Sequence, residues 1–256
     1  MRAVLTISDV TRMQGARVCV AGYLPDDTCV RPLLRVGGLT ETWLFVGRQV
    51  AVQPFARVEL DLLEHRPEPP HTEDWIIAPT YRRRLGLLDM NERAAFLERI
   101  GDGALAEIFG TPIHQDEGTY VLAGAGRRSL GTIAVERVAD VTYSPRPMGK
   151  WDYRLAFTDL AGQRYRLAVT DLAFRYLLDR WRLHDGLEPS AAARRLTSGL
   201  RAAQVFLRVG LARGWERHPD RCYVQITGVY SFPDYLEGRC FADLDPMAYS
   251  ADDVPF

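Results

Sequence analysis

The chain has 256 residues, of which 47% are hydrophobic and 25% are charged, as is ordinary for a soluble globular protein with a sizeable core. No apolar run approaches the length of a membrane span, and Ser8 and Asp9 come too early for a signal peptide, so we expect a cytoplasmic protein without membrane contact. The formal net charge of −1 argues against a strongly basic nucleic-acid binder.

Arginine carries almost all of the positive charge, since Lys150 is the single lysine. Arginine offers a planar fork for phosphates and a face that stacks on bases. A GC-rich genome would favour arginine equally, so the count alone does not decide between these explanations. The four cysteines form no CxxC pair and no disulfide framework, and we expect reduced, buried thiols at Cys19 and Cys222.

The first 63 residues contain five predicted strands separated by turn residues, at 3–7, 17–23, 29–34, 48–52 and 56–63. In the last of them Val58, Leu60 and Leu62 alternate with charged residues, which turns one apolar side toward a core. Five short strands within so few residues are typical of a small barrel.

Residues 64–86 are predicted to be an irregular extension of this barrel, because four prolines interrupt them. The extension carries the densest basic run of the chain, a candidate clamp for a nucleic-acid backbone that consists of Tyr81, Arg82, Arg83 and Arg84. A solvated charge run is the alternative explanation. Residues 71–75 hold His71, Glu73 and Asp74, the only compact cluster of catalytic residue types, and the alternative there is a loop packed by Trp75.

Residues 89–108 are predicted to form a helix that joins the two β-rich halves of the chain. Asp89 and Glu92 give this helix a start that is similar to a capping box. Gly101 and Gly103 interrupt its apolar stripe, so we expect two helical pieces.

A second β-rich half begins near Gly118, with strands predicted at 129–143, 151–158, 164–169, 205–211 and 222–230. The second and third of these form a hairpin. Asp171 is expected to cap a short helix from residue 172 to about 182. Residues 188–200, rich in alanine, serine and arginine, are predicted to be a loop.

Several stretches resemble the dual OB-fold family of bacteria and archaea: Arg17-Val-Cys-Val-Ala-Gly, Cys29-Val-Arg-Pro-Leu, Arg154-Leu-Ala-Phe-Thr-Asp, Tyr165-Arg-Leu-Ala-Val-Thr-Asp and Gln225-Ile-Thr-Gly-Val-Tyr. The resemblance implies a mainly β fold with α insertions (α+β), in which two OB-type β-barrels are joined by a helical segment. The expected domains are a first barrel with a proline-rich extension at 1–86, a helical connector at 87–117, a second barrel at 118–240 and an acidic tail at 241–256. Such a fold is associated with nucleic-acid or nucleotide binding and not with one activity.

Alternation along the predicted hairpin places Arg154, Arg164 and Arg166 on the face opposite its apolar one. OB barrels hold single strands with basic residues and stacking aromatic rings, so these arginines are the first candidates for nucleic-acid contact. A solvated outer face is the alternative. Three further candidates face away from the apolar side of their strands, with a core position as the alternative: Phe206, Arg208 and Tyr223.

The sequence contains none of the common catalytic motifs: it lacks a Walker A loop, a dinucleotide fingerprint, a GxSxG elbow and an HExxH pair. The histidines show no ligand spacing among themselves or with the cysteines. We therefore expect no cofactor, no metal and no catalytic residues. An enzyme that acts on nucleic acid through residues 71–75 stays an alternative.

The chain ends in Ala251-Asp-Asp-Val-Pro-Phe, which combines two carboxylates with a terminal aromatic side chain. A basic surface would attract the carboxylates, and the phenylalanine would fill an apolar pocket. These residues resemble the acidic tip of bacterial single-stranded DNA-binding proteins, the SSB family, whose tip recruits replication and repair enzymes. The resemblance implies partner contact through Asp252, Asp253, Pro255 and Phe256; a frayed acidic terminus is the alternative.

Together the two resemblances predict a non-catalytic protein that binds single-stranded DNA, or RNA. Its tip would recruit replication, repair or defence proteins that recognise SSB tips. The alternative from another class is a nucleotide or modified-base sensor of a prokaryotic defence or stress system. The sequence leaves the oligomeric state and the choice between DNA and RNA open.

Overall fold

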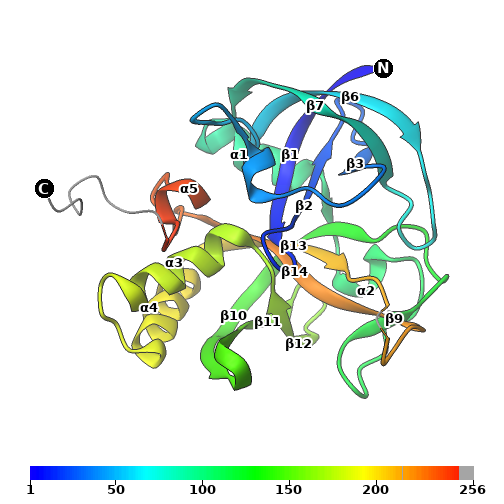
Figure 1. Ribbon diagram of the computed structural model, residues 1–256. Coiled ribbons are helices and arrows are strands. Elements are labelled where there is room, and N and C mark those ends of the chain that lie inside the picture. Colours follow the sequence, from blue (N-terminus) through cyan, green and yellow to red (C-terminus); the bar gives the residue numbers. More distant parts are fainter. Residues whose placement is uncertain (215, 248–256) are drawn as a thin grey trace, which may run out of the picture.

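Two β-barrels pack side by side in the computed structural model, which describes residues 1–214 and 216–247 (Figure 1). The first barrel closes in the order β1-β2-β3-β7-β6. Its strands are β1 (Arg2–Arg12), β2 (Val18–Tyr23), β3 (Cys29–Leu33), β6 (Ala56–His65) and β7 (Asp74–Leu87). β3 and β7 run parallel, with Leu33 opposite Ile76, and the other pairs are antiparallel. This is the Greek-key arrangement of an OB barrel.

Alternating side chains fill this barrel. On β6, Val58, Leu60 and Leu62 are buried and turn inward, as the sequence predicts. Val20 of β2 and Val30 of β3 belong to the same core. The branched side chains suit a pleated surface that is buried on one side, so local preference and burial favour the same structure here.

The fifth strand of the first barrel is not the one that the sequence predicted. Residues 48–52 belong instead to a separate hairpin, formed by the 3-10 turn η1 (Glu41–Leu44), β4 (Phe45–Val46) and β5 (Gln49–Val50). β7 closes the barrel and runs through the segment that was predicted to be irregular. Pro79 fits into this strand because its register against β6 jumps from Ile77 to Arg82, which leaves the proline in a bulge.

The second barrel closes in the order β10-β11-β12-β14-β13, with β13 pairing back to β10. Its strands are β10 (Leu130–Arg146), β11 (Lys150–Asp159), β12 (Arg164–Val169), β13 (Gln204–Leu211) and β14 (Arg221–Phe232), with the turn η2 (Pro147–Gly149) between the first two. β12 and β14 are parallel, with Ala168 opposite Gln225. The predicted hairpin of β11 and β12 is confirmed. Two short strands extend the sheet, β8 (Gly101–Asp102) on β10 and β9 (Tyr120–Leu122) on β14.

Two predicted helix starts are confirmed. The Asp89 carboxylate accepts the backbone N–H groups of Asn91 and Glu92 and begins α1 (Met90–Arg99). The Asp171 carboxylate accepts the N–H of Phe174 and begins α3 (Leu172–Leu183). The helix predicted over 89–108 is divided as expected, since α2 (Leu105–Ile108) follows the two glycines. None of the helices in the described residues has the length and apolar run that a bilayer crossing requires.

Residues 188–200 form a helix, α4 (Pro189–Arg201), where the sequence was predicted to be a loop. The proline lies in the first turn, where a missing N–H leaves no hydrogen bond unmade. The buried side chains recur at helical spacing, at Ala192, Ala193, Leu196, Thr197 and Leu200. The prediction was wrong because small alanine and threonine side chains make up most of this stripe and hide its periodicity.

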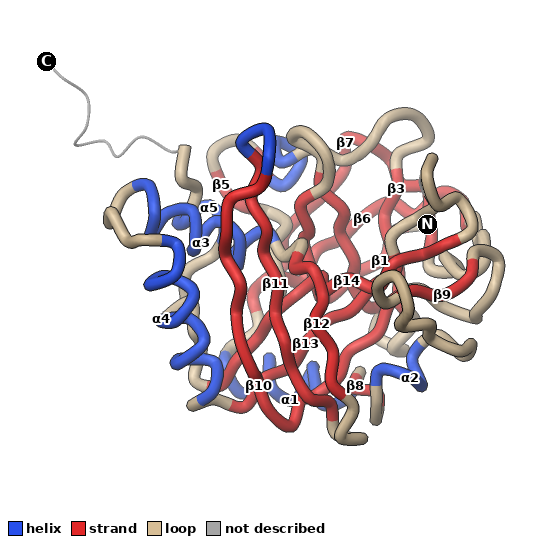
Figure 2. The backbone as a smooth tube through the Cα atoms, turned by 90° about the horizontal axis from the view of Figure 1, so that it is seen from below, coloured by secondary structure: helices blue, strands red, loops and turns tan. Residues whose placement is uncertain are grey.

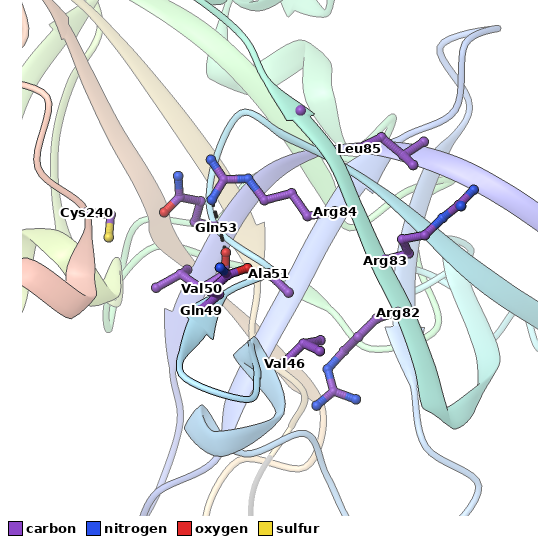
Figure 3. Close-up of a pocket in the computed structure, with 11 residues that line it drawn as sticks. Val46, Gln49, Val50, Ala51, Gln53, Arg82, Arg83, Arg84, Leu85 and Cys240 are labelled. Atoms are coloured by element: carbon purple, nitrogen blue, oxygen red, sulfur yellow. Dashed lines mark hydrogen bonds between the residues drawn. The ribbon is translucent and has the colours of Figure 1, made fainter.

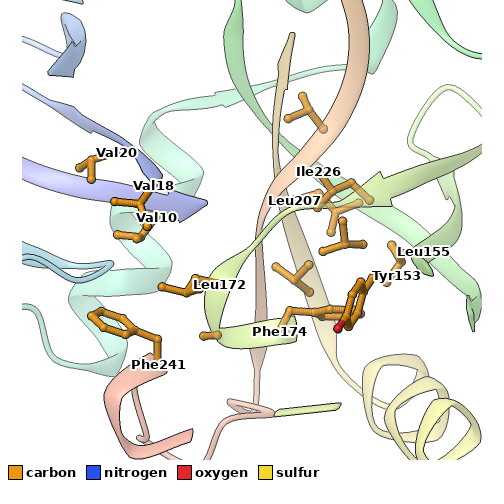
Figure 4. Packing of buried hydrophobic residues seen from close by; sticks show 14 of the residues in the cluster. Val10, Val18, Val20, Tyr153, Leu155, Leu172, Phe174, Leu207, Ile226 and Phe241 are labelled. Atoms are coloured by element: carbon orange, nitrogen blue, oxygen red, sulfur yellow. The ribbon is translucent and has the colours of Figure 1, made fainter. Parts of the chain in front are cut away.

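The hydrophobic core continues from one barrel to the other (Figure 4). Leu172, at the start of α3, lies between Val18 of the first barrel and Phe174 on the side of the second, and Phe241, in α5 (Phe241–Leu244), belongs to the same cluster. Figure 2 shows α3 and α4 along one side of the second barrel, where they form the connection between β12 and β13. The two barrels are therefore joined by packing as well as by chain.

Candidate nucleic-acid interface

The outward side of the β11–β12 hairpin carries three arginines. Each pairs with a small residue of the neighbouring strand: Arg154 with Ala168, Arg166 with Ala156 and Arg164 with Thr158. Residues paired across antiparallel strands point to the same side of a sheet, so the three arginines share one face. The structure thus places them as the alternation predicts, and their contact with nucleic acid stays a prediction.

Two of these arginines are open to solvent. Arg164 and Arg166 are exposed, and the Arg166 guanidinium donates to the Thr142 hydroxyl of β10 at 3.0 Å. A hydroxyl orients a guanidinium without neutralising its charge. Because their cross-strand neighbours are small, both side chains stand clear of the sheet and are available to an anion.

Arg154 is more constrained than its neighbours. Its Nε donates to the Asp152 carboxylate at 2.9 Å, and the same carboxylate lies 3.0 Å from Nη2 of Arg146. Asp140 adds a second carboxylate on the outward side of β10, opposite Ala156. Arginines still outnumber carboxylates on this face, so its net charge is positive.

Tyr223 belongs to an aromatic cluster at the start of β14. Its ring centroid lies 5.7 Å from that of Tyr120 and 6.1 Å from that of His218. Tyr120 stacks on His114 at 5.1 Å, and the Arg221 guanidinium lies 4.6 Å over its ring. β14 pairs with β12 at Gln225 and Ile226 and with β9 at residues 221–223. The aromatic cluster therefore lies on the same outward side of the sheet, next to the arginines. Sequence reasoning found only Tyr223, because the other rings come from segments without a clear strand pattern.

Phe206 and Arg208 do not reach the open face of β11 and β12; Phe206 only borders a separate hollow beside Ala134 and Gln204. Both candidates face away from their own barrel, as predicted, but that side of β13 packs against the first barrel, and both are buried. Nε of Arg208 donates to the Asp9 carboxylate at 3.0 Å, and its Nη1 donates to the hydroxyls of Tyr23 and Thr132, each at 2.9 Å. Burial also raises the pKa of Tyr23, so its hydroxyl stays protonated. Both residues are thereby removed from the candidate interface.

The corresponding outward face of the first barrel, on β2 and β3, is covered by the second half of the chain. Nε of the buried Arg31 donates to Asp74 at 2.6 Å, and its Nη1 donates to the Ser129 hydroxyl of the second half at 3.2 Å. Arg213, after β13, binds the other oxygen of Asp74. The Glu73 carboxylate accepts the N–H of Ser129 at 2.6 Å and its hydroxyl at 3.0 Å. The side of an OB barrel that commonly receives ligands is here occupied by the other barrel.

These contacts determine what residues 71–75 do. Both carboxylates of the segment bind across the barrel contact, Glu73 to Ser129 and Asp74 to Arg213, so in the described structure neither is a free general acid or base. Trp75 is half-buried and stacks on His65 with ring centroids 4.8 Å apart. His71 is 3% exposed, and burial lowers the pKa of its ring to about 3, which keeps it neutral. This arrangement agrees with the packed-loop alternative and not with a carboxylate pair.

The basic run on β7 lies beside a groove of about 780 Å³ (Figure 3). Arg82 and Arg84 point toward the β4–β5 hairpin and donate to its backbone carbonyls, Arg82 at 2.6 Å and Arg84 at 3.0 Å. Tyr81 and Arg83 take the opposite side of the strand, where both bind Glu59. The four predicted residues therefore do not act as one clamp, because the strand divides them between two surfaces.

No three His, Cys, Asp or Glu side chains gather as a metal site within residues 1–214 and 216–247. All four cysteines lie unpaired. The predicted partner-binding residues, Asp252, Asp253, Pro255 and Phe256, fall outside the residues that the structure describes.

Comparison with known proteins supports the fold on independent grounds. A search of curated proteins gave no match to the chain. The family model of the dual OB-containing domain matches residues 4–229, which include nearly all of both barrels. Since this match covers most of the sequence, the chain belongs to the dual OB-containing domain family.

Proposed function

We propose that this protein binds single-stranded nucleic acid, DNA in the first place, on the outward face of β11 and β12. One observation carries the proposal. In the described chain the second barrel leaves the outward side of its second and third strands open, and that side bears Arg164 and Arg166. OB barrels commonly receive oligonucleotides on this pair of strands. The family assignment supports the same class of ligand, as an inference from the fold.

The face combines the two interactions that a single strand requires. Arg164 and Arg166 bind backbone phosphates, and the cluster around Tyr223 provides ring surfaces for bases. Stacking is worth about 1–3 kcal/mol per base, so a few contacts hold a strand even on a protein whose net charge is close to zero. The strand is bound and not chemically changed.

The test is a titration of the full chain with a fluorescent oligo-dT, longer than one barrel's site of roughly 4–16 nucleotides, at two salt concentrations. Arg164→Glu combined with Arg166→Glu is expected to weaken binding at least about tenfold and to reduce the salt slope by roughly 1.4, or 0.7 for each lost phosphate contact. An oligo-U titration compares RNA with DNA.

The matched control is Arg57→Glu combined with Arg194→Glu, which makes the same change in net charge at exposed positions elsewhere. The control should keep both the affinity and the slope of the wild type. Equal losses in the two double variants, or a wild type that does not bind at low salt, would refute the proposed face.

The C-terminal tip forms the second part of the proposed function. Asp252, Asp253, Pro255 and Phe256 recruit a protein that recognises SSB tips, by the charge and pocket contacts expected from their sequence. Deleting Phe256 should weaken capture of such a protein at least about tenfold, because burying a phenylalanine is worth roughly 1.5–3 kcal/mol. Oligo-dT affinity should be unchanged or higher. A partner that binds the shortened chain equally well would contradict this role.

A further inference from the structure

The groove of Figure 3 is built differently from the arginine face. It lies between β7 and the β4–β5 hairpin of the first barrel, with Cys240 at one end. Its volume of about 780 Å³ is within the range of roughly 300–1,000 Å³ that is usual for small-ligand sites. Among the described residues that line it there are arginines, glutamines and apolar side chains but no carboxylate.

We propose that this groove binds a nucleoside that carries a terminal phosphate, either a free nucleotide or the 5′ end of a strand. Only first-barrel residues are needed for it, so it does not depend on the arginine face of the second barrel.

The groove offers two arginines, Arg82 and Arg84, which reach opposite edges of the hairpin (Figure 3); the exposed Arg84 provides the phosphate site. The two guanidinium groups are directed by the carbonyls of Phe45 and Val50, at 2.6 and 3.0 Å. Carbonyls orient a cation but leave its charge for another ligand, whereas Arg83, on the same strand, already lies 3.2 Å from the Glu59 carboxylate.

Arg82 is the more enclosed of the two. Its guanidinium carbon lies 5.1 Å from the centroid of the Trp43 ring, and the Trp43 indole N–H is held by the Pro79 carbonyl at 2.9 Å. Partial burial lowers the pKa of Arg82, which is the expected effect on a cation that has lost water without gaining an anion. A phosphate dianion at Arg84 would accept hydrogen bonds from that guanidinium group, and a sugar hydroxyl of the same ligand would restore part of the solvation that Arg82 has lost.

The rest of the groove suits a nucleoside. Val46 and Val50 of the hairpin provide apolar surface for a base or sugar. Gln49 and Gln53 each offer one amide donor group and one acceptor, the combination that reads the edge of a base. Inorganic phosphate would use only Arg84, so the nucleoside should add measurable affinity.

The experiment is isothermal titration of the full chain with AMP, GMP, CMP and TMP separately, and with inorganic phosphate. At least one nucleotide is expected to bind tenfold or more tightly than inorganic phosphate. Arg84→Gln should weaken that nucleotide about ten- to a hundredfold, as is usual for loss of a charged hydrogen bond. Arg35→Gln, at an exposed position whose guanidinium is paired with Glu64, is the matched control and should leave binding unchanged.

A second variant separates the base from the phosphate. Gln49→Leu replaces an exposed side chain of the hairpin and should reduce the preference among the four nucleotides while keeping phosphate affinity. The proposal is overturned if none of the four nucleotides binds, if inorganic phosphate binds as tightly as all of them, or if Arg35→Gln weakens binding as much as Arg84→Gln.

The source of the phosphate is decided by oligo-dT with a 5′-phosphate or a 5′-hydroxyl. Tighter binding of the phosphorylated strand, abolished by Arg84→Gln, identifies a strand end as the ligand. Nucleotide binding without a 5′-phosphate effect identifies a free nucleotide. The Arg164→Glu and Arg166→Glu double variant keeps its nucleotide affinity in either case, so failure of this site is distinguishable from failure of the strand-binding face.

Discussion

The two barrels share one fold and differ in what covers the outward side of their second and third strands. In the first barrel this side holds Arg31, which is 6% exposed and bound to Asp74. In the second barrel the same side holds Arg166, which is exposed and bound only by a hydroxyl among the contacts of the described residues. Repeating a fold therefore does not repeat a binding site, because the neighbour of each face decides its use.

Burying an arginine costs desolvation free energy, which an exposed arginine does not lose. Removing a guanidinium and a carboxylate from water carries a penalty of several kcal/mol per ion, which their attraction repays only when geometry and further hydrogen bonds are good. Arg208 meets that condition through Asp9, Tyr23 and Thr132. Such a network fixes how the barrels fit together more than it adds net stability.

Breaking the buried pair should give the largest effect. Arg208→Met leaves Asp9 buried without its cation and is expected to lower the free energy of unfolding by about 3–5 kcal/mol. Urea denaturation measures the loss. Combining it with Asp9→Leu should recover part of the stability, and Arg166→Met on the open face should change it by less than about 0.5 kcal/mol. Equal losses from Arg208→Met and Arg166→Met would remove the distinction between the two faces.

Lowering the pH should reduce the stability of the folded chain through the buried His71. The pKa of this ring is lowered to about 3 by burial, against an ordinary value of 6.5, so the unfolded chain binds a proton that the folded chain refuses. Its stability contribution is complete above pH 6.5 and falls by up to about 1.4 kcal/mol per pH unit as the pH drops toward 3.

The His71 effect is isolated by comparing the wild type with His71→Gln across this range. Asp171, whose pKa burial raises to about 7, contributes stability that is complete below its ordinary pKa and is lost as the pH rises toward 7. This opposite slope is present in both proteins, so the difference between their denaturation midpoints reports on His71. Parallel curves would show that the histidine does not titrate as its burial requires.

Stacking of bases on Tyr223 should contribute to strand binding on the second barrel. Tyr223→Ala should weaken oligo-dT binding by about 1–3 kcal/mol in the titration described above, because a ring surface is lost. Tyr223→Phe keeps that surface and should bind as the wild type does. A loss in the phenylalanine variant equal to that in the alanine variant would assign the effect to the hydroxyl instead.

The smallest effect is expected at the cap of α1. This helix packs Phe96 and Leu97 into the aromatic cluster between the barrels, together with Phe206 and Tyr230. Asp89→Ala removes its capping box and should cost about 1 kcal/mol in urea denaturation. Asp89→Asn, which retains an acceptor, should lose less, and an unchanged midpoint in the alanine variant would show that the helix start does not limit stability.

Local patterns predicted the elements that depend on local chemistry. The β11–β12 hairpin follows from strict alternation, and the starts of α1 and α3 follow from Asp89 and Asp171. β7 was missed because a bulge accommodates Pro79, which otherwise ends a strand. The domain limits at residues 86, 117 and 240 stay a prediction.

The candidate site could be predicted only in part, for a physical reason. Periodicity tells which side of a strand a residue occupies but not what covers that side. Arg208 faces outward as predicted, yet its partner Asp9 lies 199 positions away in the chain. Arg166 shows the same local pattern and stays in solvent. No signal within either strand distinguishes these two arginines.

The contact between the two barrels limits how this chain can be shortened. A fragment containing the second barrel alone would expose Phe206, Arg208 and Tyr230, which are buried in the intact chain. A fragment containing the first barrel alone would leave Arg31 and Glu73 without Ser129. The smallest piece that keeps the oligonucleotide face intact is consequently the pair, and anyone shortening the protein for a reagent should remove residues from its ends and not from its middle.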